Sequence, residues 1–570
     1  MLSVLRLHLP SDIPIVGCEL SPYVQLRLPD GTTTTDDVPV TSPIDGYYLR
    51  WKWCRIQTDK RASVCSVHPS EPATLQCIGC LKAKLPVSKS LHCSSKCFSD
   101  SWRHHRAMHA HATNIARENG AEEDELFGRG GSVGGGAPVS NGIIGGPTKT
   151  QDQNGTEIWE VGSVKTYTPT EEDVGHALKL ECVVMSTATG MPTGGLSNSL
   201  LTQRVIPAPC PPPRRMVQVN TIDGLELDGR LGAPGSFTVL SYNVLADLYA
   251  TSDMYSYCPQ WALSWAYRRQ NLLREIVGYR ADILCLQEIQ SDHFDEFFAP
   301  ELEKHGYSAV YKKKTAEVYA AGVYTIDGCA TFYRNDRFLQ VKKYEVEFNK
   351  AAQSFSEAYM PSAQRKAALT RLLKDNVALI VVLEVLDYPD PSKKQLICVA
   401  NTHIHANPEL KDVKLWQVQT LLKGLEKIAA SAEIPMLVAG DFNSVPGSAP
   451  HSLLATGRVE PTHPELAIDP LGILRPASKL CHQLPLVSAY SALSRRDGSN
   501  EPLFTNCTRD FLGTLDYIFY TADSIVVDSL LELLDEESLR KDTALPSPEW
   551  SSDHIALLAE FRCRPSRLRR

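Results

Sequence analysis

Short apolar segments that end or begin at a group of polar side chains are the feature that most constrains this chain. Six such groups lie between residues 237 and 561. If the segments are strands whose ends meet at one rim, these carboxylates, amides and imidazoles converge, as metal-assisted phosphodiester hydrolysis requires. Each group alone is more simply a turn or a corner, but all six in this order make coincidence improbable. In chain order the polar residues are Asn243, Glu288, His403, Asp441 with Asn443, Asp516, and Asp553 with His554.

The same region alternates strand patterns with helical ones, which predicts an α/β fold. A helix is expected where Leu272 and Ile276 share a face, and another where Leu415, Val418 and Leu422 do. This mixture over so many residues favours a sandwich of two packed sheets, although periodicity leaves a doubly wound sheet open. The expected strands are 237–242, 282–286, 329–334, 377–386, 395–403, 435–439, 514–520 and 555–561.

Length and charge limit the classes of protein. A chain of 570 residues is too long for one ordinary core, so two or more domains are expected. The net charge of −8 means that the protein as a whole does not attract nucleic acid electrostatically. Any RNA binding must therefore be local. No apolar stretch of about 18 residues is present to cross a bilayer, and the chain is interpreted as intracellular. Its sixteen cysteines are then thiols or metal ligands.

Composition divides the chain into six parts. The strand-like segments on either side of the Cys/His cluster are compatible with two halves of one small β-domain. The Pro-rich stretch after them is typical of a stiff spacer. The parts are a β-rich region over 1–60, the Cys/His cluster over 64–112, a flexible Gly-rich linker over 113–155, a second β-rich piece over 156–206, a Pro/Gly linker over 207–235, and the catalytic domain over 236–565.

The order of the polar groups resembles the endonuclease/exonuclease/phosphatase superfamily, over roughly residues 236–563. Segments 286–290 (LQEIQ), 327–333 (DGCATFY) and 504–506 (FTN) look like its deadenylase branch, most of all the plant homologues of carbon catabolite repressor 4. Abasic-site endonucleases usually carry a lysine where this chain has Gln290. The resemblance implies a four-layer α/β sandwich, in which helices flank two packed mixed sheets.

The resemblance also implies an activity and roles for the rim residues. The activity is Mg²⁺-dependent 3′-to-5′ removal of poly(A) that releases 5′-AMP, with one or two Mg²⁺ ions, in the catalytic subunit of the Ccr–Not complex. Carboxylates suit Mg²⁺ as hard ligands, and an aligned carboxylate suits a general base. The implied roles are Mg²⁺ binding for Glu288, completed or supported by Asn243 and Asp553, general base for Asp441, phosphate contacts for Asn443 and His403, and transition-state stabilisation for His554 oriented by Asp516.

Two further positions match residues that clamp an adenine in the deadenylases. These are Pro408 and Phe511, which alone would be interpreted as a loop proline and a core aromatic. Stacking between flat groups is worth about 1–3 kcal/mol per base and tolerates any base. The family usually has a tryptophan shortly before the proline, where this chain has Ala406. The lysine run 312–314 is more typical of a solvated turn than of an RNA contact.

Four ligand pairs near the N-terminus predict two structural Zn²⁺ sites, because two or three intervening residues let both side chains of a pair reach one tetrahedral ion. Their order resembles a MYND-type finger, with histidines at positions 68 and 109 where that family has cysteines. Such fingers bind proline-rich peptides. The pairs are Cys65 with His68, Cys77 with Cys80, Cys93 with Cys97, and His105 with His109, and Cys54, His92, His104 and His111 are competing ligands nearby.

The leucine-rich repeats of fungal and animal homologues have no counterpart in this sequence. We therefore expect the finger to dock the second deadenylase subunit, and expect poly(A) RNA and the Ccr–Not scaffold as further partners. The expected compartments are the cytoplasm, including mRNA-decay foci, and the nucleus, with no membrane partner. Two alternatives stay open: a nocturnin-like phosphatase acting on NADP, and an assembly adaptor that acts mainly through the finger.

Overall fold

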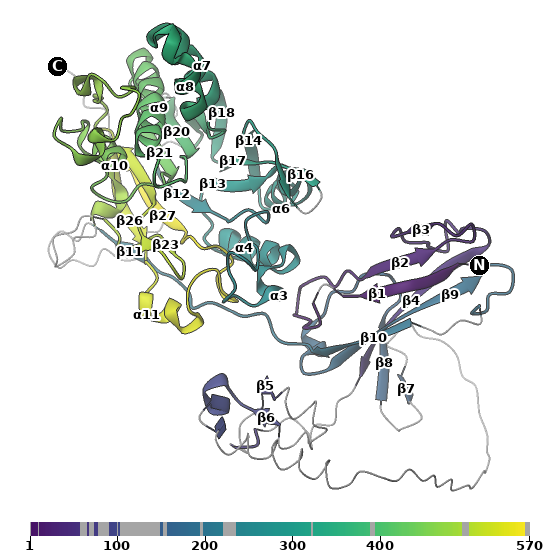
Figure 1. The fold of residues 1–570 in the computed structure, drawn as a ribbon. Helices are drawn as coiled ribbons and strands as arrows, with labels where there is room; N and C mark the ends of the chain where they lie inside the picture. The colour runs from purple at the N-terminus through teal and green to yellow at the C-terminus, as the bar shows by residue number, and fades with distance from the viewer. Residues whose placement is uncertain are drawn as a thin grey trace, which may run out of the picture. The chain divides into compact units, whose positions relative to one another are not determined.

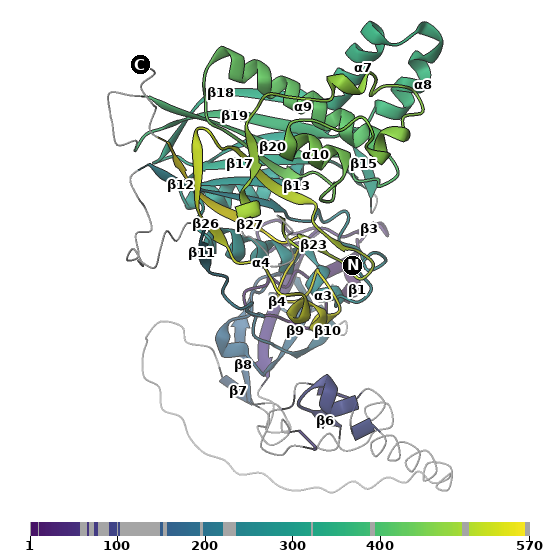
Figure 2. The ribbon, with the colours of Figure 1, turned by 90° about the vertical axis from the view of Figure 1, so that its left-hand side faces the viewer.

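The computed structural model divides into two units, Met1–Ala208 and Pro209–Arg570. Figures 1 and 2 show strands dominating the first unit, and sheets with helices in the second. Within the described residues, no helix is long and apolar enough to span a bilayer. The structure describes residues 2–9, 11–56, 65–67, 73, 75–77, 90–99, 101–102, 149–151, 157–193, 198–219, 235–320, 323–387, 394–492 and 501–564.

The second unit contains two large mixed sheets. The seven-stranded sheet joins, in order, β11 (Met216–Gln218), β26 (Ile525–Leu531), β27 (Leu557–Cys563), β12 (Ser236–Asn243), β13 (Ile283–Gln290), β17 (Asp327–Arg334) and β14 (Tyr307–Lys313). The six-stranded sheet joins β18 (Phe338–Glu347), β19 (Val377–Val385), β20 (Gln395–His403), β21 (Met436–Asp441), β25 (Asp516–Thr521) and β22 (Leu486–Ser488).

The two sheets pack face to face because their strands are apolar on both sides. On β19, Leu379 and Val381 enter the core between the sheets, whereas Ile380 and Val382 face the helices beyond the six-stranded sheet. The outer face of the seven-stranded sheet is covered in the same way, with Tyr242 in that core. The predicted four-layer α/β sandwich is confirmed, and the alternative of a doubly wound sheet is excluded.

Helices supply the two outer layers (Figure 1). Beyond the seven-stranded sheet lie α4 (Trp265–Gly278) and the segment of α5 (Ser291–His293), η4 (Phe294–Phe298) and α6 (Ala299–Lys304). Beyond the six-stranded sheet lie α7 (Phe348–Tyr359), α8 (Ser362–Leu372), α9 (Lys411–Ser431) and α10 (Ala449–Thr456). Short helices α3 (Gln260–Leu263) and α11 (Glu536–Leu539) also belong to this unit.

Strand direction brings the polar groups to one rim. Strand β12 is parallel to β13, and β20 is parallel to β21, so the carboxyl ends of each pair meet. Strands β25 and β27 run antiparallel to β21 and β12, so each begins where its neighbour ends. Gly440 permits this packing, because a Cβ there would lie 2.0 Å from the carbonyl oxygen of Thr402.

A buried amide ties the two sheets together beneath the rim. The Nδ2 of Asn401, on β20, donates to the carbonyl oxygens of Leu286 (3.1 Å) and Ala330 (2.9 Å) on β13 and β17. Its Oδ1 accepts a hydrogen bond of 2.8 Å from Nε2 of Gln287. Because Asn401 is fully buried, these bonds fix how the sheets are aligned.

The first unit is built from strands on both sides of the Cys/His stretch. A five-stranded sheet joins β10 (Asn198–Arg204), β9 (Ala177–Ser186), β4 (Tyr47–Ile56), β8 (Glu157–Gly162) and β7 (Lys149–Gln151). A three-stranded sheet joins β1 (Ser3–His8), β2 (Tyr23–Arg27) and β3 (Thr33–Thr34). Both contribute to one core, which includes Val24 and Leu26 from the smaller sheet and Trp53 from the larger.

One carboxylate joins the distant segments of this unit. Asp173, fully buried, accepts hydrogen bonds from Arg55 Nε (2.6 Å), Tyr167 OH (2.7 Å), and Thr170 N and Oγ1 (2.8 and 3.2 Å). Burial opposes its charge, but the donors outweigh burial and hold the pKa of Asp173 below its ordinary value. The carboxylate therefore stabilises the fold in its ionised form.

We predict that Asp173→Asn lowers the free energy of unfolding of the first unit by about 3 kcal/mol at pH 7, because a buried partner of Arg55 loses its charge. The folded pKa is depressed, so this contribution is present above the unfolded pKa of about 4 and is lost as pH falls through the folded value. Calorimetry of the full chain measures it. The control is Glu172→Gln, which also removes an Arg55 partner, but an exposed one. A similar loss in both variants would contradict the assignment.

Candidate active site

The rim places two of its side chains through strained backbone. Glu288 lies in a bulge of β13, between Leu286 and Ile289, with φ of 58°. Asn443, just after β21, has φ of 47°. Residues other than glycine seldom adopt positive φ, and such strain concentrates at functional sites.

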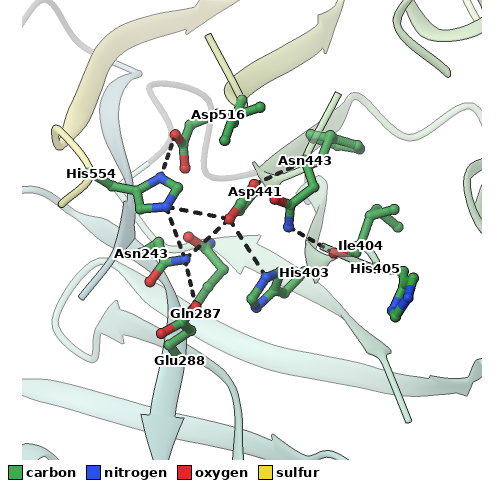
Figure 3. A network of polar contacts seen from close by, with 12 residues as sticks. Asn243, Gln287, Glu288, His403, Ile404, His405, Asp441, Asn443, Asp516 and His554 are labelled. Atoms are coloured by element: carbon green, nitrogen blue, oxygen red, sulfur yellow. Dashed lines mark hydrogen bonds and ion pairs between the residues drawn. The ribbon is translucent and has the colours of Figure 1, made fainter. Parts of the chain in front are cut away.

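Asn243 connects the two halves of the site (Figure 3). Its Nδ2 lies 3.1 Å from Glu288 Oε1 on the seven-stranded sheet and 3.1 Å from Asp441 Oδ2 on the six-stranded sheet. Its Oδ1 accepts a hydrogen bond from Leu245 N (3.0 Å). The side chain that ends β12 therefore sets the spacing of the two carboxylates.

An imidazole–carboxylate pair completes the centre. His554 Nδ1 lies 2.8 Å from Asp516 Oδ2, and His554 Nε2 points toward Asp441 Oδ2 at 3.7 Å. Asp516 is itself held by Thr505 Oγ1, which donates to Oδ2 at 2.6 Å. Ligand atoms of Asp441, Asp516 and His554 all lie within 4.8 Å of one another. The hydrogen bond between the last two orients the imidazole, with Nε2 directed at Asp441.

Both titratable groups of this centre have raised pKa values: the carboxyl group of Asp441 and the imidazole of His554. Burial, and then Asp516, raise the pKa of Asp441 to about 7, although His554 and two hydrogen bonds act against the shift. Burial lowers the pKa of His554, but the carboxylates of Asp516, Asp553 and Asp441 outweigh it and raise the pKa well above its ordinary value. A base near pH 7 beside a cationic imidazole suits acid–base chemistry.

His403 ends β20 beside Asp441, with Nε2 at 3.5 Å from Oδ2. Burial, with the nearby charges of Lys314 and two histidines, lowers its pKa well below the ordinary value. His403 is therefore a neutral imidazole that can donate one hydrogen bond into the site.

The remaining carboxylates fit a cation. Burial, and then Asp327, raise the pKa of Glu288, with Asp553 also contributing, while Lys314 opposes the shift. Asp553 Oδ2 accepts from Tyr255 OH (2.9 Å) and Asn506 Nδ2 (3.2 Å), while Oδ1 is buried with no hydrogen-bond partner among the described residues. Such an arrangement of partly compensated carboxylates is what a divalent ion stabilises.

A cavity of about 410 Å³ opens beside this centre. It brings Pro408 and Phe511, far apart in sequence, to the same space as Asn443. Phe511 lies in the turn between β23 (Asn506–Cys507) and β24 (Leu512–Gly513), and its ring is close enough to Gly513 that a Cβ there would meet it at 2.8 Å. The cavity joins two flat apolar groups to a catalytic candidate.

Half of the predicted zinc ligands can be placed. His68, Cys80, His105 and His109 lie outside the described residues. Cys65 Sγ lies 3.6 Å from Cys97 Sγ, near the distance of about 3.8 Å expected for two thiolates on one tetrahedral Zn²⁺. His92, on β6 (Leu91–His92), which pairs with β5 (Leu75–Gln76), brings Nδ1 to 3.9 Å from Cys97 Sγ. Cys65, His92 and Cys97 form one cluster of potential ligands; Cys77 and Cys93 are not part of it.

Known proteins match both the site region and the whole chain. The model of the Endonuclease/Exonuclease/phosphatase family matches residues 240–554. Carbon catabolite repressor protein 4 homolog 1 of Arabidopsis thaliana is 62% identical over 99% of both chains. This chain belongs to that family of carbon catabolite repressor 4 homologues. Members of the wider superfamily use divalent metal ions, in agreement with the charge of the rim.

Two more distant proteins match about three fifths of this chain. The CCR4-Not complex 3′-5′-exoribonuclease subunit Ccr4 of Schizosaccharomyces pombe is 34% identical over 58% of this chain and 49% of its own length. The crystal structure of ANGEL2, a 2′,3′-cyclic phosphatase, in complex with adenosine-2′,3′-vanadate is 31% identical, covering 62% of this chain and 99% of that one, with a TM-score of 0.49.

Sequence reasoning missed Lys414, in the first turn of α9. Its Nζ donates a hydrogen bond of 2.6 Å to the carbonyl oxygen of Asn443. The residue also lines the cavity that contains Pro408 and Phe511. Burial lowers the pKa of Lys414 to about 8, against the attraction of Asp441 and Glu465 and together with the repulsion of Lys411. The apolar face of the helix was legible in the sequence, but nothing marked which lysine turns inward.

The lysine run also differs from its expected solvated turn. Lys312 and Lys313 lie on β14, and Lys314 is nearly buried, with Nζ 2.8 Å from Asp327 Oδ2. This pair adjoins Glu288, since both of its charges affect the Glu288 pKa. Lys314 thus belongs to the electrostatic surroundings of the site.

We predict that Lys414→Met lowers kcat about tenfold, because a charge-assisted hydrogen bond to Asn443 is lost. In the unchanged chain, kcat falls as pH rises through about 8, where the ammonium loses its proton. Lys414→Arg, which stays charged, removes that fall. A pH–rate profile measures both effects, and Lys423→Met, at an exposed position of the same helix, serves as control. An identical alkaline limb in all variants would contradict the role.

Proposed function

We propose that this chain is a Mg²⁺-dependent 3′-to-5′ exoribonuclease that removes poly(A) and releases 5′-AMP. The observation that carries the proposal is the cavity that joins Pro408 and Phe511 to Asn443, next to the Asp441–His554 centre. A nuclease centre with an adjoining space for one flat base suits removal of single nucleotides from an end. The Ccr4 relatives, which are 3′-5′-exoribonuclease subunits, point the same way.

The residues divide the hydrolysis among them. Asp441 accepts a proton from the water that attacks phosphorus, and the bond from phosphorus to the 3′-oxygen of the preceding nucleotide breaks. His554, held by Asp516, donates to the phosphoryl oxygens and offsets their growing charge. Asn443 and His403 donate further hydrogen bonds to the phosphate. The raised pKa of His554 keeps this imidazole cationic at neutral pH.

Glu288 and Asp553 would hold the magnesium. Bound there, the ion supplies positive charge to the phosphate and the leaving oxygen. Asn243 uses its amide nitrogen for both carboxylates and its oxygen for Leu245 N, which favours support of Glu288 over direct ligation. Glu288, with φ of 58°, would direct its carboxylate toward that ion.

Adenine would lie between Pro408 and Phe511. Both side chains are accessible, with Phe511 38% exposed, as expected for groups that contact a base only when substrate is bound. Lys411 and Glu465, which pair at 3.2 Å, line the same cavity and offer a donor and an acceptor to a base edge. Stacking gives affinity, and such edge contacts give preference among bases.

We predict that the purified chain shortens 5′-labelled RNA stepwise through a run of twenty 3′-terminal adenosines and stops at the boundary of the run. EDTA abolishes the reaction, and Glu288→Ala lowers its rate by about a hundredfold or more, because charge stabilisation at the phosphate is lost. Gel electrophoresis resolves each step.

The controls separate the parts of this proposal. RNA with a non-adenosine end tests base preference, and shortening of both RNAs at one rate would remove the adenine clamp but keep the exonuclease. NADP as substrate tests the nocturnin-like alternative. A folded, Mg²⁺-supplied chain that hydrolyses NADP and leaves RNA intact would overturn the proposal.

For the N-terminal stretch we propose a structural zinc finger that docks the partner deadenylase. The approach of Cys65 and Cys97 supports one of the two Zn²⁺ sites, where His92, in the same cluster, competes with a predicted ligand. The other ligands proposed are His68, Cys77, Cys80, Cys93, His105 and His109. Relatives that are CCR4-Not subunits support assembly of this chain into such a complex. For that complex we propose the cytoplasm and the nucleus as compartments.

We predict that deleting residues 64–112 abolishes co-purification with the second deadenylase subunit, whereas the deleted chain keeps its exonuclease rate on free RNA. The measurement is recovery of the partner in a two-protein pull-down. Cys97→Ser, which removes one ligand of the described cluster, is the point-mutant counterpart. Full recovery of the partner by the deleted chain would sink the docking role.

A further inference from the structure

A small hairpin of the second unit carries two exposed tyrosines. Strands β15 (Val318–Ala320) and β16 (Val323–Thr325) form a two-stranded sheet of their own. Tyr319 and Tyr324 face each other across it, with ring centroids 5.0 Å apart, and are 64% and 68% exposed. Paired aromatic rings that remain in water are typical of a binding surface.

The base of this hairpin is fastened to the catalytic rim. Gln290 Nε2 donates to Thr325 Oγ1 at 3.3 Å, and Gln290 Oε1 accepts from Leu248 N at 2.7 Å. The backbone of Ser291 donates to the carbonyl of Ile326 at 2.8 Å. Gln290 follows Glu288 by two residues on β13, so the strand that carries the proposed metal ligand also fastens the hairpin.

The direction of the reaction tells which part of an RNA lies there. In an in-line displacement, the attacking water and the leaving oxygen lie on opposite sides of phosphorus. In the proposed mechanism the attacking water lies next to Asp441, its base. Asn243 lies between Asp441 and Glu288 (Figure 3). The leaving 3′-oxygen, and the whole chain upstream of it, therefore lie on the Glu288 side. Gln290, on the same strand as Glu288, fastens the hairpin on that side, and the terminal adenosine would occupy the Pro408 cavity.

Charge agrees with this path. Of the three consecutive lysines before the hairpin, Lys312 pairs with Glu345 (3.0 Å) and Glu347 (2.6 Å), and Lys314 pairs with Asp327. Lys313, at the end of β14, is exposed and has no ion pair within the described residues. In a chain of net charge −8, this local cation is free to meet a phosphate.

We propose that Tyr319 and Tyr324, with Lys313, form a subsite that stacks adenine bases upstream of the scissile bond. The inference rests on the proposed exoribonuclease function and extends it to a longer single-stranded substrate. Aromatic rings stack on any base, and an exposed lysine without an ion-pair partner can neutralise a backbone phosphate. The subsite holds the tail while the last nucleotide is removed.

The test is the double variant Tyr319→Ala/Tyr324→Ala of the full chain. Two values of kcat/KM are measured, one for a twenty-adenosine RNA and one for the 3′,5′-linked dinucleotide ApA. The ratio of the first to the second should fall about tenfold, since only the long RNA reaches the hairpin. The matched control is Tyr359→Ala, a 74% exposed tyrosine of α7 on the same unit. Tyr319→Phe/Tyr324→Phe should keep the original ratio, because stacking needs the ring and not the hydroxyl.

A binding measurement keeps this test separate from the proposed activity. Fluorescence anisotropy of labelled twenty-adenosine RNA is followed on Asp441→Asn chains with and without the tyrosine pair. We expect Kd to rise about tenfold without the pair, and Lys313→Ser to lower the slope of log Kd against log salt concentration by about one. Loss of the tyrosine pair could weaken RNA binding while the unaltered chain shows no turnover of RNA. That result would overturn the proposed exoribonuclease function but keep the subsite.

Two results would overturn the subsite. One is an unchanged Kd for the long RNA in the double tyrosine variant, when its circular dichroism matches that of the unaltered chain. The exposed tyrosines would then be assigned to contact with a protein partner. The other is an equal loss of kcat/KM on both substrates, which would show damage to the catalytic rim instead of a lost upstream contact.

Discussion

The alignment of the two sheets depends on one buried side chain. Asn401 bonds to β13 and β17 through its amide nitrogen, and to Gln287 through its oxygen. An amide without partners at this depth is costly, so the sheets are favoured only in the register that satisfies it. That register puts Asp441 and Asp516 of one sheet against Asn243, which ends β12 of the other, and His554, which precedes β27.

The same constraint explains why the charges at the rim are shifted. Two sheets closed over an apolar interior bring several carboxylates together where little water reaches them. Each carboxylate is then stabilised by a fixed partner: His554 beside Asp516, Lys314 beside Asp327, and an ion for Glu288 and Asp553 in our proposal. The centre is thus arranged before a substrate arrives, which is the condition for electrostatic catalysis.

The sandwich and the rim were predictable from sequence because both follow from short-range patterns. Strand 395–403 was predicted with both of its observed ends, since its apolar run stops at His403. The strand of Glu288 was predicted to end four residues early, because its bulge places a carboxylate within the strand. Lys414, Asn401 and the tyrosine hairpin were not identified, since their importance comes from tertiary contacts that no periodicity records. The individual roles of the rim residues remain proposals.

The first unit has a consequence for how the chain is made. Strand β4 pairs along its whole length with β9, which begins 121 residues after β4 ends. At a synthesis rate of about 5–20 residues per second, β4 emerges on the order of ten seconds before its partner exists. During that interval Trp51 and Trp53, destined for the core, lack the strand that pairs with β4 along its whole length. The core of the first unit can therefore close only after the residues between the two strands have been translated.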